Sequence, residues 1–230
     1  MQVEKLKTID ADTLLTTPLH KTLFVVEGLI PQGLSVLSGS SKIGKSWLML
    51  WLGIQVARGN PVWEFKTHKR DVLYLCLEDT YARIQSRLYQ LTDEAPSELR
   101  IATTSYQIGC GLEQQIEQYL ADYPMTKLVI IDTFQKVRES KSISGKNGMY
   151  AGDYDDISAL KGISDQYGIA VVVVHHVRKL RDANDPFNEV TGSTGITGAA
   201  DTSFLLKRSR SSETGTLLAT GRDIAYQELT

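Results

Sequence analysis

The sequence predicts an α/β fold: a mostly parallel, twisted sheet with helices on both faces and a C-terminal antiparallel hairpin. Apolar runs typical of buried strands recur along the 230 residues, and most are followed by a turn and a segment with helical spacing. The last two runs, TSFLLKR and TLLATGRD, are separated by SRSSETG, which is typical of a hairpin. A hydrophobic content of 42% is enough for one substantial core.

Composition excludes several classes of protein. The 25 basic residues nearly balance the 27 acidic ones, which argues against a globally basic nucleic-acid coat protein. Cys76 and Cys110 lack the paired spacing of a metal site or disulfide framework. The polar N-terminus is unlike a signal peptide, and no apolar stretch approaches the roughly 20 residues that cross a bilayer. We therefore expect a cytoplasmic protein with no membrane partner.

The first half of the chain alternates strand and helix. A strand is expected at 34–37, followed by a glycine-rich loop and a helix over 47–59 that Gly59 ends. A second buried strand is expected at 71–77. Thr80 is then a suitable N-cap for the amphipathic segment that follows it.

The second half continues the same order. A weak strand near Ile101 leads into the amphipathic helix LEQQIEQYLADY, which Pro124 ends. A strand buried on both faces is expected at 128–131. A short helix over 157–163 then precedes the strand IAVVVVHH.

Two segments without apolar periodicity, 136–156 and 178–198, are interpreted as irregular loops. We expect residues 1–27 to form an N-terminal extension and residues 28–230 to form one domain.

A phosphate-binding loop is the strongest motif. Gly39, Gly44, Lys45 and Ser46 match G-x-x-x-x-G-K-[ST] between an expected strand and an expected helix, which argues against a chance glycine-rich turn. Glycines let backbone N–H groups surround a phosphate, the lysine reaches the β- and γ-phosphates, and the serine hydroxyl binds Mg²⁺. The expected nucleotide-binding residues are Gly39, Ser40, Ser41, Lys42, Ile43, Gly44, Lys45, Ser46 and Trp47.

Acidic residues follow two of the strands. Asp132 ends an apolar strand, where an α/β sheet places ligand-binding groups, and we expect it to join Ser46 at Mg²⁺. Its alternative role is to cap the turn at Thr133. Glu78 and Asp79 end the strand before it, and Glu78 is the candidate general base. Asp79 could instead cap the helix that begins near Thr80.

Two histidines, His175 and His176, end the strand IAVVVV. One imidazole could contact the γ-phosphate, and the alternative is a purely structural histidine. Because side chains alternate along a strand, only one of the two can face the site.

The chain resembles the RecA-like superfamily of P-loop ATPases, and within it the hexameric replicative-helicase branch that includes plasmid RepA-type helicases and the AAA-labelled ATPases of phages and mobile elements. The similarity runs from about Gly28 to the end, through the segments GLIPQGLSVLSGSSKIGKS, LYLCLED, LVIIDTF, VVVVHHVRK, GSTGITGAAD and LLATGRD. It implies that Glu78 is the catalytic base, that Asp132 is the metal-side acid and that His176 senses the γ-phosphate.

The resemblance further implies an arginine that enters the active site of a neighbouring subunit. LLATGRD favours Arg222, and Arg208 is a second candidate, although each could be a solvated hairpin charge. The family's DNA-contacting loops correspond to 136–156 and 178–198. Their basic residues, which could also be simply solvated, are Lys136, Arg138, Lys141, Lys146, Arg178, Lys179 and Arg181.

The expected function is ATP hydrolysis by a homo-oligomeric, hexameric ring that moves on single-stranded DNA as a helicase or translocase, with ATP and Mg²⁺ as ligands, in replication of a plasmid, phage or mobile element. The alternative is a KaiC-like or recombination-mediator-like switch that assembles with ATP and recruits a partner without unwinding. A small-molecule kinase fits poorly, since no lid with clustered arginines is evident. No primase-binding or collar-like region is recognised, so we expect a bare motor or a piece of a longer protein.

Overall fold

The computed structural model describes residues 5–19, 22–138, 146–176, 187, 194–209 and 212–230. Its main sheet contains β3 (Gly33–Gly39), β4 (Asp71–Cys76), β5 (Leu99–Ala102), β6 (Thr126–Asp132), β7 (Ala170–His176), β8 (Thr202–Lys207), β9 (Thr216–Gly221) and β10 (Gln227–Leu229). The strands lie in the order β10-β9-β8-β3-β7-β6-β4-β5. In this order, the strands from β8 to β5 run parallel to one another. At the other end of the sheet, β9 pairs antiparallel with β8, and β10 pairs antiparallel with β9.

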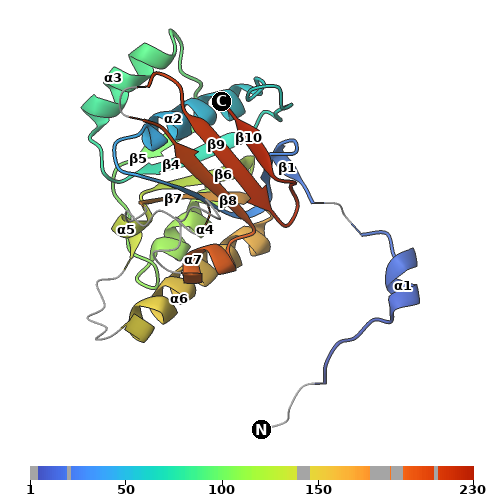
Figure 1. Ribbon diagram of the computed structural model, residues 1–230. Helices are drawn as coiled ribbons and strands as arrows, with labels where there is room; N and C mark the ends of the chain where they lie inside the picture. Colours follow the sequence, from blue (N-terminus) through green and yellow to red (C-terminus); the bar gives the residue numbers. More distant parts are fainter. Residues whose placement is uncertain (1–4, 20–21, 139–145, 177–186, 188–193, 210–211) are drawn as a thin grey trace.

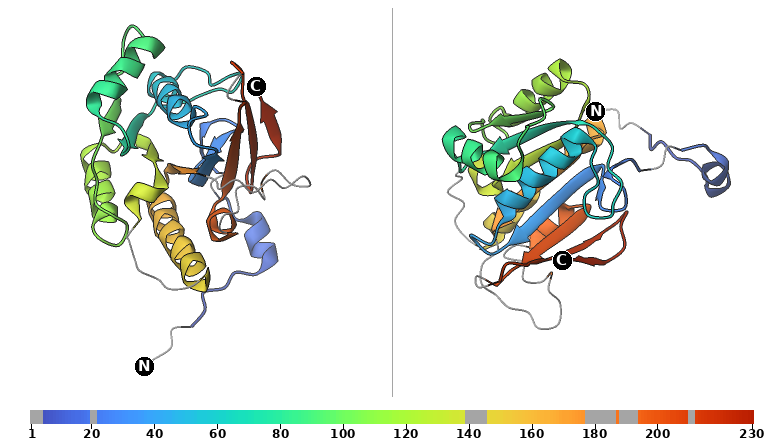
Figure 2. Two further views of the ribbon diagram at one scale, coloured as in Figure 1. Left: turned by 60° about the vertical axis from the view of Figure 1, so that its left-hand side comes forward. Right: turned by 90° about the horizontal axis from the view of Figure 1, so that it is seen from above.

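Helices cover both faces of this sheet (Figures 1 and 2). The helices are α1 (Ala11–Thr16), α2 (Lys45–Arg58), α3 (Tyr81–Leu91), α4 (Leu112–Asp122), α5 (Phe134–Val137), α6 (Lys146–Tyr167) and α7 (Thr194–Ala199). Side chains of α2 and α3 pack in one apolar cluster with one face of the sheet. Those of α4, α5, α6 and α7 pack in a second cluster with the opposite face. The predicted α/β architecture with its C-terminal hairpin is confirmed.

Local sequence signals set the ends of the helices near the site. Gly59 ends α2 in the left-handed conformation, with φ of 73°, and its N–H group bonds the carbonyl groups of the last turn. Thr80 is the N-cap of α3, because its hydroxyl accepts a hydrogen bond from the Arg83 N–H group at 3.3 Å. Both predicted signals are confirmed.

The carboxyl ends of four parallel strands meet at one edge of the sheet. The register places Gly39 of β3 beside His176 of β7, and Cys76 of β4 beside Asp132 of β6. Glu78 follows β4 by two residues at the same edge. This edge therefore gathers the phosphate-loop, acid and histidine motifs of the sequence.

Both segments interpreted as irregular loops contain helix. Residues 134–137 form α5, and α6 begins at Lys146, so the expectation of an irregular segment over 136–156 is wrong. The expected short helix over 157–163 is the second half of the 22-residue α6, where Ile157 and Leu160 supply the buried apolar stripe that signalled it. The stretch 178–198 likewise ends in α7, whose Ile196 is buried.

The N-terminal residues contribute two small elements. A two-stranded ribbon pairs β1 (Phe24–Val26) with β2 (Ile30–Pro31), and Val25 and Val26 are buried in the α2-side cluster. The predicted domain boundary at residue 28 falls in the turn between these strands. By contrast, α1 has no buried residue and stands apart from the body of the protein (Figure 1). Among the described helices, none is long and apolar enough to cross a membrane.

Candidate active site

The loop between β3 and α2 has the backbone conformation that its glycines permit. Gly39 has φ of 157°, and a Cβ there would lie 2.8 Å from the Leu206 carbonyl oxygen. Gly44 has φ of 109°, which an L side chain rarely adopts, and it is the N-cap of α2. Ser40 to Lys42 are exposed between them. The loop thus presents the N-terminus of a 14-residue helix, where unpaired N–H groups and the helix dipole attract an anion.

Lys45 lies buried beneath this loop. Its ammonium group donates to the carbonyl oxygens of Gly39 and Ser40 at 2.7 and 2.8 Å and contacts His176 Nδ1 at 3.0 Å. Burial lowers the pKa of Lys45 to about 8, although the charges of Asp132 and Glu78 act in the opposite direction. No carboxylate among the described residues forms a direct ion pair with Lys45, and a phosphate at the loop would supply that counter-charge.

Asp132, at the end of β6, is buried on the α2 side of the sheet. Its Oδ2 accepts a hydrogen bond from the Tyr74 hydroxyl at 2.8 Å. Among the described residues, none offers a hydrogen bond to its Oδ1. Burial raises the pKa of Asp132, although the nearby hydroxyl groups of Ser46 and Tyr74 lower it in part. A buried carboxylate oxygen without a partner, beside a serine hydroxyl, fits the ligand set of Mg²⁺.

Glu78 and Asp79 have different environments. Glu78 is about half exposed and accepts a hydrogen bond from the buried Thr133 hydroxyl at 3.1 Å. Asp79 is buried in ion pairs with Arg83 at 2.8 Å and Arg87 at 2.5 Å. Burial alone would raise the pKa of Asp79, but its bonds to the two arginines bring it below its usual value. The Asp79 carboxylate is thus held in ion pairs with two arginines, while the Glu78 carboxylate faces the pocket.

The two histidines point to opposite faces, as the alternation along β7 predicts. His176 contacts Lys45, and its Nε2 lies 3.8 Å from Glu78 Oε2. An ammonium group only donates, so Nδ1 of His176 accepts and the proton of the neutral ring sits on Nε2, toward Glu78. His175 lies against Phe134, with ring centroids 6.1 Å apart. The structure therefore brings His176, and not His175, to the phosphate loop.

A pocket of about 490 Å³ lies beside the phosphate loop. Its lining residues are Ser41, Lys42, Gly44, Lys45, Ser46, Trp47, Glu78, Asp79, Arg83, Arg87 and His176. The Arg87 guanidinium lies 5.5 Å from the centre of the Trp47 ring. Sequence reasoning assigned no role to Arg83 and Arg87. In the sequence, Arg83 follows Asp79 by four residues and Arg87 follows Arg83 by four. This spacing indicates that all three lie on one face of a helix, and it was the signal that could have identified the two arginines.

Arg222 and Arg208 lie at opposite ends of the hairpin. Arg208 follows β8 at the phosphate-loop edge, where it donates to the Ser212 carbonyl oxygen at 2.9 Å and borders a pocket with Gly39. Arg222 follows β9 at the far edge, because Gly221 pairs with Thr202 at the start of β8. A seven-residue strand spans roughly 20 Å. Arg222 therefore cannot reach the phosphate loop of its own chain.

Arg222 is held by an acid that sequence reasoning did not single out. Asp201 Oδ1 accepts from Arg222 at 3.2 Å, and its carboxylate also binds the Lys161 ammonium at 2.6 Å. Asp201 Oδ2 further accepts from the Leu34 N–H group at 3.0 Å. The Arg222 side chain nevertheless remains 62% exposed, so it is available on the surface.

The basic residues assigned to DNA fall into four groups. Lys136 is exposed at the end of α5. Arg138 forms an ion pair with Asp156 of α6 at 3.2 Å and lies 5.3 Å from the Phe134 ring centre. Lys146 begins α6, and its side chain is not described. The other four, Lys141, Arg178, Lys179 and Arg181, lie outside the described residues.

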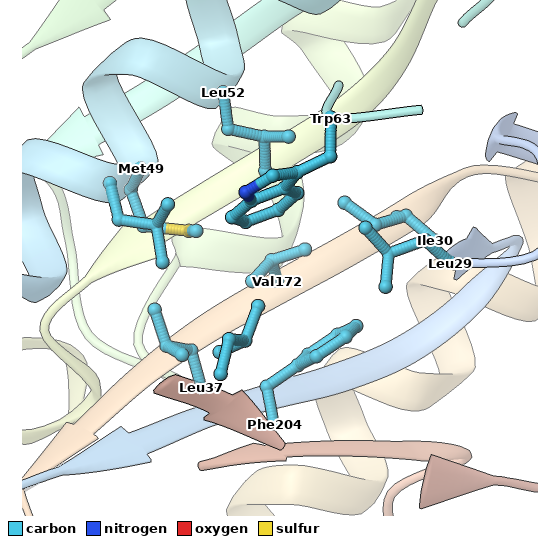
Figure 3. Close-up of a pocket in the computed structure, with 10 residues that line it drawn as sticks. Leu29, Ile30, Leu37, Met49, Leu52, Trp63, Val172 and Phe204 are labelled. Atoms are coloured by element: carbon cyan, nitrogen blue, oxygen red, sulfur yellow. The ribbon is translucent and has the colours of Figure 1, made fainter. Parts of the chain in front are cut away.

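A small apolar pocket lies under α2, away from these groups. Figure 3 shows Met49 and Leu52 of α2 facing Leu37 and Val172 of the sheet, with Trp63 closing one side. Its volume of about 20 Å³ would hold a single water molecule at most, and its lining is apolar. We interpret it as a packing gap and not as a ligand site.

Comparisons with known proteins agree with this geometry. The family model of the AAA domain matches residues 2–182. No match is found among the curated proteins. A solved structure of an ATPase domain aligns with a TM-score of 0.65 and 13% identity over 86% of this chain and 80% of that chain.

A second solved structure is a DnaB-like replicative helicase, described with its interactions with primase. It aligns with a TM-score of 0.72 and 14% identity over 98% of this chain. The alignment spans 64% of the helicase chain. These likenesses confirm the predicted RecA-like fold.

Proposed function

Because the chain belongs to the AAA domain family and is an ATPase, we propose that it uses ATP hydrolysis to move along single-stranded DNA as a replicative helicase or translocase. The observation that carries this proposal is the convergence of Lys45, Asp132, Glu78 and His176 at one sheet edge beside the phosphate loop. A nucleotide site, a metal-side acid and a free carboxylate together are what hydrolysis of a phosphoanhydride requires. The proposed setting is cytoplasmic replication of a plasmid, phage or mobile element.

Nucleotide binding is assigned to the loop from Gly39 to Trp47. Lys45 would exchange its two carbonyl contacts for phosphate oxygens, which removes the cost of a buried cation without a counter-charge. Ser46 and Asp132 would hold Mg²⁺ through the serine hydroxyl and the unpartnered Oδ1. When bound, Mg²⁺ neutralises charge on the β- and γ-phosphates.

Hydrolysis is assigned to Glu78 as the general base. Its carboxylate faces the pocket, where the hydroxyl of Thr133 holds Oε1 and His176 Nε2 lies 3.8 Å from Oε2. We assign Oε2 to accept a proton from water. His176 bridges Lys45 and Glu78, and we propose that it loses its bond to Lys45 when phosphate binds. Such an exchange would let His176 report the γ-phosphate to the segment that follows β7.

The proposed assembly is a homo-oligomeric ring, hexameric by analogy with the helicase branch. Arg222 is exposed at the edge opposite its own phosphate loop, which supports a role in the site of a neighbouring subunit. We assign DNA contact to the segments 136–156 and 178–198, which follow β6 and β7 at the catalytic edge.

Strand displacement tests the motor against the switch that only assembles. The protein is incubated with a forked DNA duplex and ATP, and its size is measured with and without ATP. A motor separates the strands with the wild-type chain and not with Glu78→Gln. ATP-dependent assembly without strand separation would instead favour the switch that recruits a partner.

A further inference from the structure

One buried contact of Asp132 lies outside the roles assigned so far. Tyr74 stands on β4, two residues before Cys76, which is the register partner of Asp132. Its hydroxyl donates to Asp132 Oδ2 at 2.8 Å, and its side chain is 1% exposed. The same hydroxyl lies 3.4 Å from the Ser46 carbonyl oxygen. Tyr74 therefore touches both elements that carry the proposed metal ligands.

A phenylalanine would fill this apolar site without burying a hydroxyl. Burying a hydroxyl is costly unless it makes a hydrogen bond, and the Tyr74 hydroxyl donates its hydrogen bond to the Asp132 carboxylate. A phenol is protonated at neutral pH, so the Tyr74 hydroxyl is the donor in this contact. The contact is thus directional: one carboxylate oxygen is held and the other, Oδ1, is left without a partner among the described residues.

We propose that Tyr74 is a positioning residue for Mg²⁺, an inference that rests on the proposed function. By holding Oδ2, Tyr74 fixes the rotation of the Asp132 carboxylate and keeps Oδ1 directed to the metal position beside Ser46. Partners in the second shell of a metal commonly orient its ligands in this way. Tyr74 itself contacts neither Mg²⁺ nor phosphate in this assignment.

Binding of a fluorescent ADP analogue measures the effect without any turnover. Titrations are made with EDTA and at a series of Mg²⁺ concentrations for the wild type, Tyr74→Phe and Tyr119→Phe. Tyr119→Phe is the matched control, since it removes a partly buried phenol from α4 on the other face of the sheet. Thermal unfolding of each variant verifies that the fold is intact.

Tyr74→Phe should bind the analogue in EDTA within about twofold of the wild type, while the Mg²⁺ concentration for half-maximal enhancement rises about tenfold. Tyr119→Phe should match the wild type in both conditions. Tyr74→Phe should also add nothing further in an Asp132→Asn background, because its effect acts through that carboxylate.

Equal Mg²⁺ dependence of Tyr74→Phe and the wild type would overturn the assignment of Tyr74. An equal effect of Tyr74→Phe in EDTA and in Mg²⁺ would also overturn it, since that is the signature of a structural role. A wild type that fails to bind the analogue under any condition would instead contradict the proposed function itself.

Discussion

Lys45 and Asp132 are opposite charges buried on the same side of the sheet, and each lacks part of its solvation. Burial lowers the pKa of Lys45 to about 8 and raises the pKa of Asp132. Both shifts have the sign expected for charges that await a ligand, a phosphate for the lysine and a cation for the acid. Both shifts therefore fit the proposed nucleotide site.

Residues that belong to a sequence motif were predictable, whereas the residues that contact them in the fold were not. Lys45 and Ser46 could be assigned because the phosphate loop has a defined spacing. The roles of Tyr74 and Thr133 depend on contacts between neighbouring strands, which no local pattern encodes. Likewise, alternation along β7 predicted that one histidine faces the site, and the resemblance favoured His176. The contact with Lys45 places His176 at the phosphate loop.

Glu78→Gln should lower the rate of phosphate release about 10³-fold and leave ATP binding intact, because it removes the proton acceptor alone. Asp79→Asn should keep the rate within about tenfold of the wild type, since Asp79 is engaged with Arg83 and Arg87. Phosphate release and binding of a fluorescent ATP analogue are measured for both variants. The opposite ranking would make Asp79 the base.

Strands were the best-predicted elements, because their apolar runs are buried on both faces. Ile130 and Ile131 of β6 are fully buried, for example, and such runs stand out from their surroundings. The first turns of α6 were missed, since the apolar spacing begins only near Ile157. The three-residue β10 was missed as well, because it is too short to show a period.

Packing between α2 and the sheet sets much of the stability near the phosphate loop. Leu52, 3% exposed, borders the small apolar pocket, so Leu52→Ala should enlarge an existing gap (Figure 3). The expected loss in free energy of unfolding is about 3 kcal/mol. Leu14→Ala on α1, which buries no residue, should cost less than about 0.5 kcal/mol. Denaturant unfolding compares the two, and equal losses would argue against this packing.

The connection from β4 to α3 should make stability depend on pH. The folded-state pKa of Asp79 lies below its unfolded value, so its ion pairs stabilise the fold above about pH 4 and are lost as the pH falls through the folded pKa. Asp79→Asn should lower the free energy of unfolding by about 2 kcal/mol at pH 7 and by less at pH 3. The exposed control, Asp93→Asn, should have little effect at either pH. If the difference in free energy of unfolding between the wild type and Asp79→Asn stayed constant from pH 7 to pH 3, the stabilising role of the Asp79 ion pairs would be contradicted.

The residues with proposed functions lie at two opposite edges of the sheet. The catalytic groups and the segments assigned to DNA follow the carboxyl ends of the parallel strands, whereas Arg222 lies at the opposite edge. A ring of copies would bring the two edges of neighbouring subunits together. The sequence could suggest Arg222 only by resemblance, because an arginine that acts between subunits has no partner pattern within one chain.

Mixing inactive variants tests whether Arg222 acts between subunits. Arg222→Ala and Glu78→Gln should each be inactive alone. An equal mixture should regain about a quarter of wild-type turnover, since random assembly pairs an intact Glu78 with a neighbour's intact Arg222 at that frequency. Lys45→Ala mixed with Glu78→Gln should regain nothing, because both defects lie in the same half-site. No recovery in the first mixture would exclude Arg222 from the neighbouring site.

We propose that ATP hydrolysis at the Lys45–Glu78 site drives movement on DNA. The most direct measurement is the steady-state rate of phosphate release with and without single-stranded DNA, first at low salt and then at high salt. DNA should raise the rate of the wild type at low salt, and added salt should weaken this stimulation because phosphate contacts carry the binding. A rate that is the same with and without DNA at low salt would rule out hydrolysis coupled to movement on DNA.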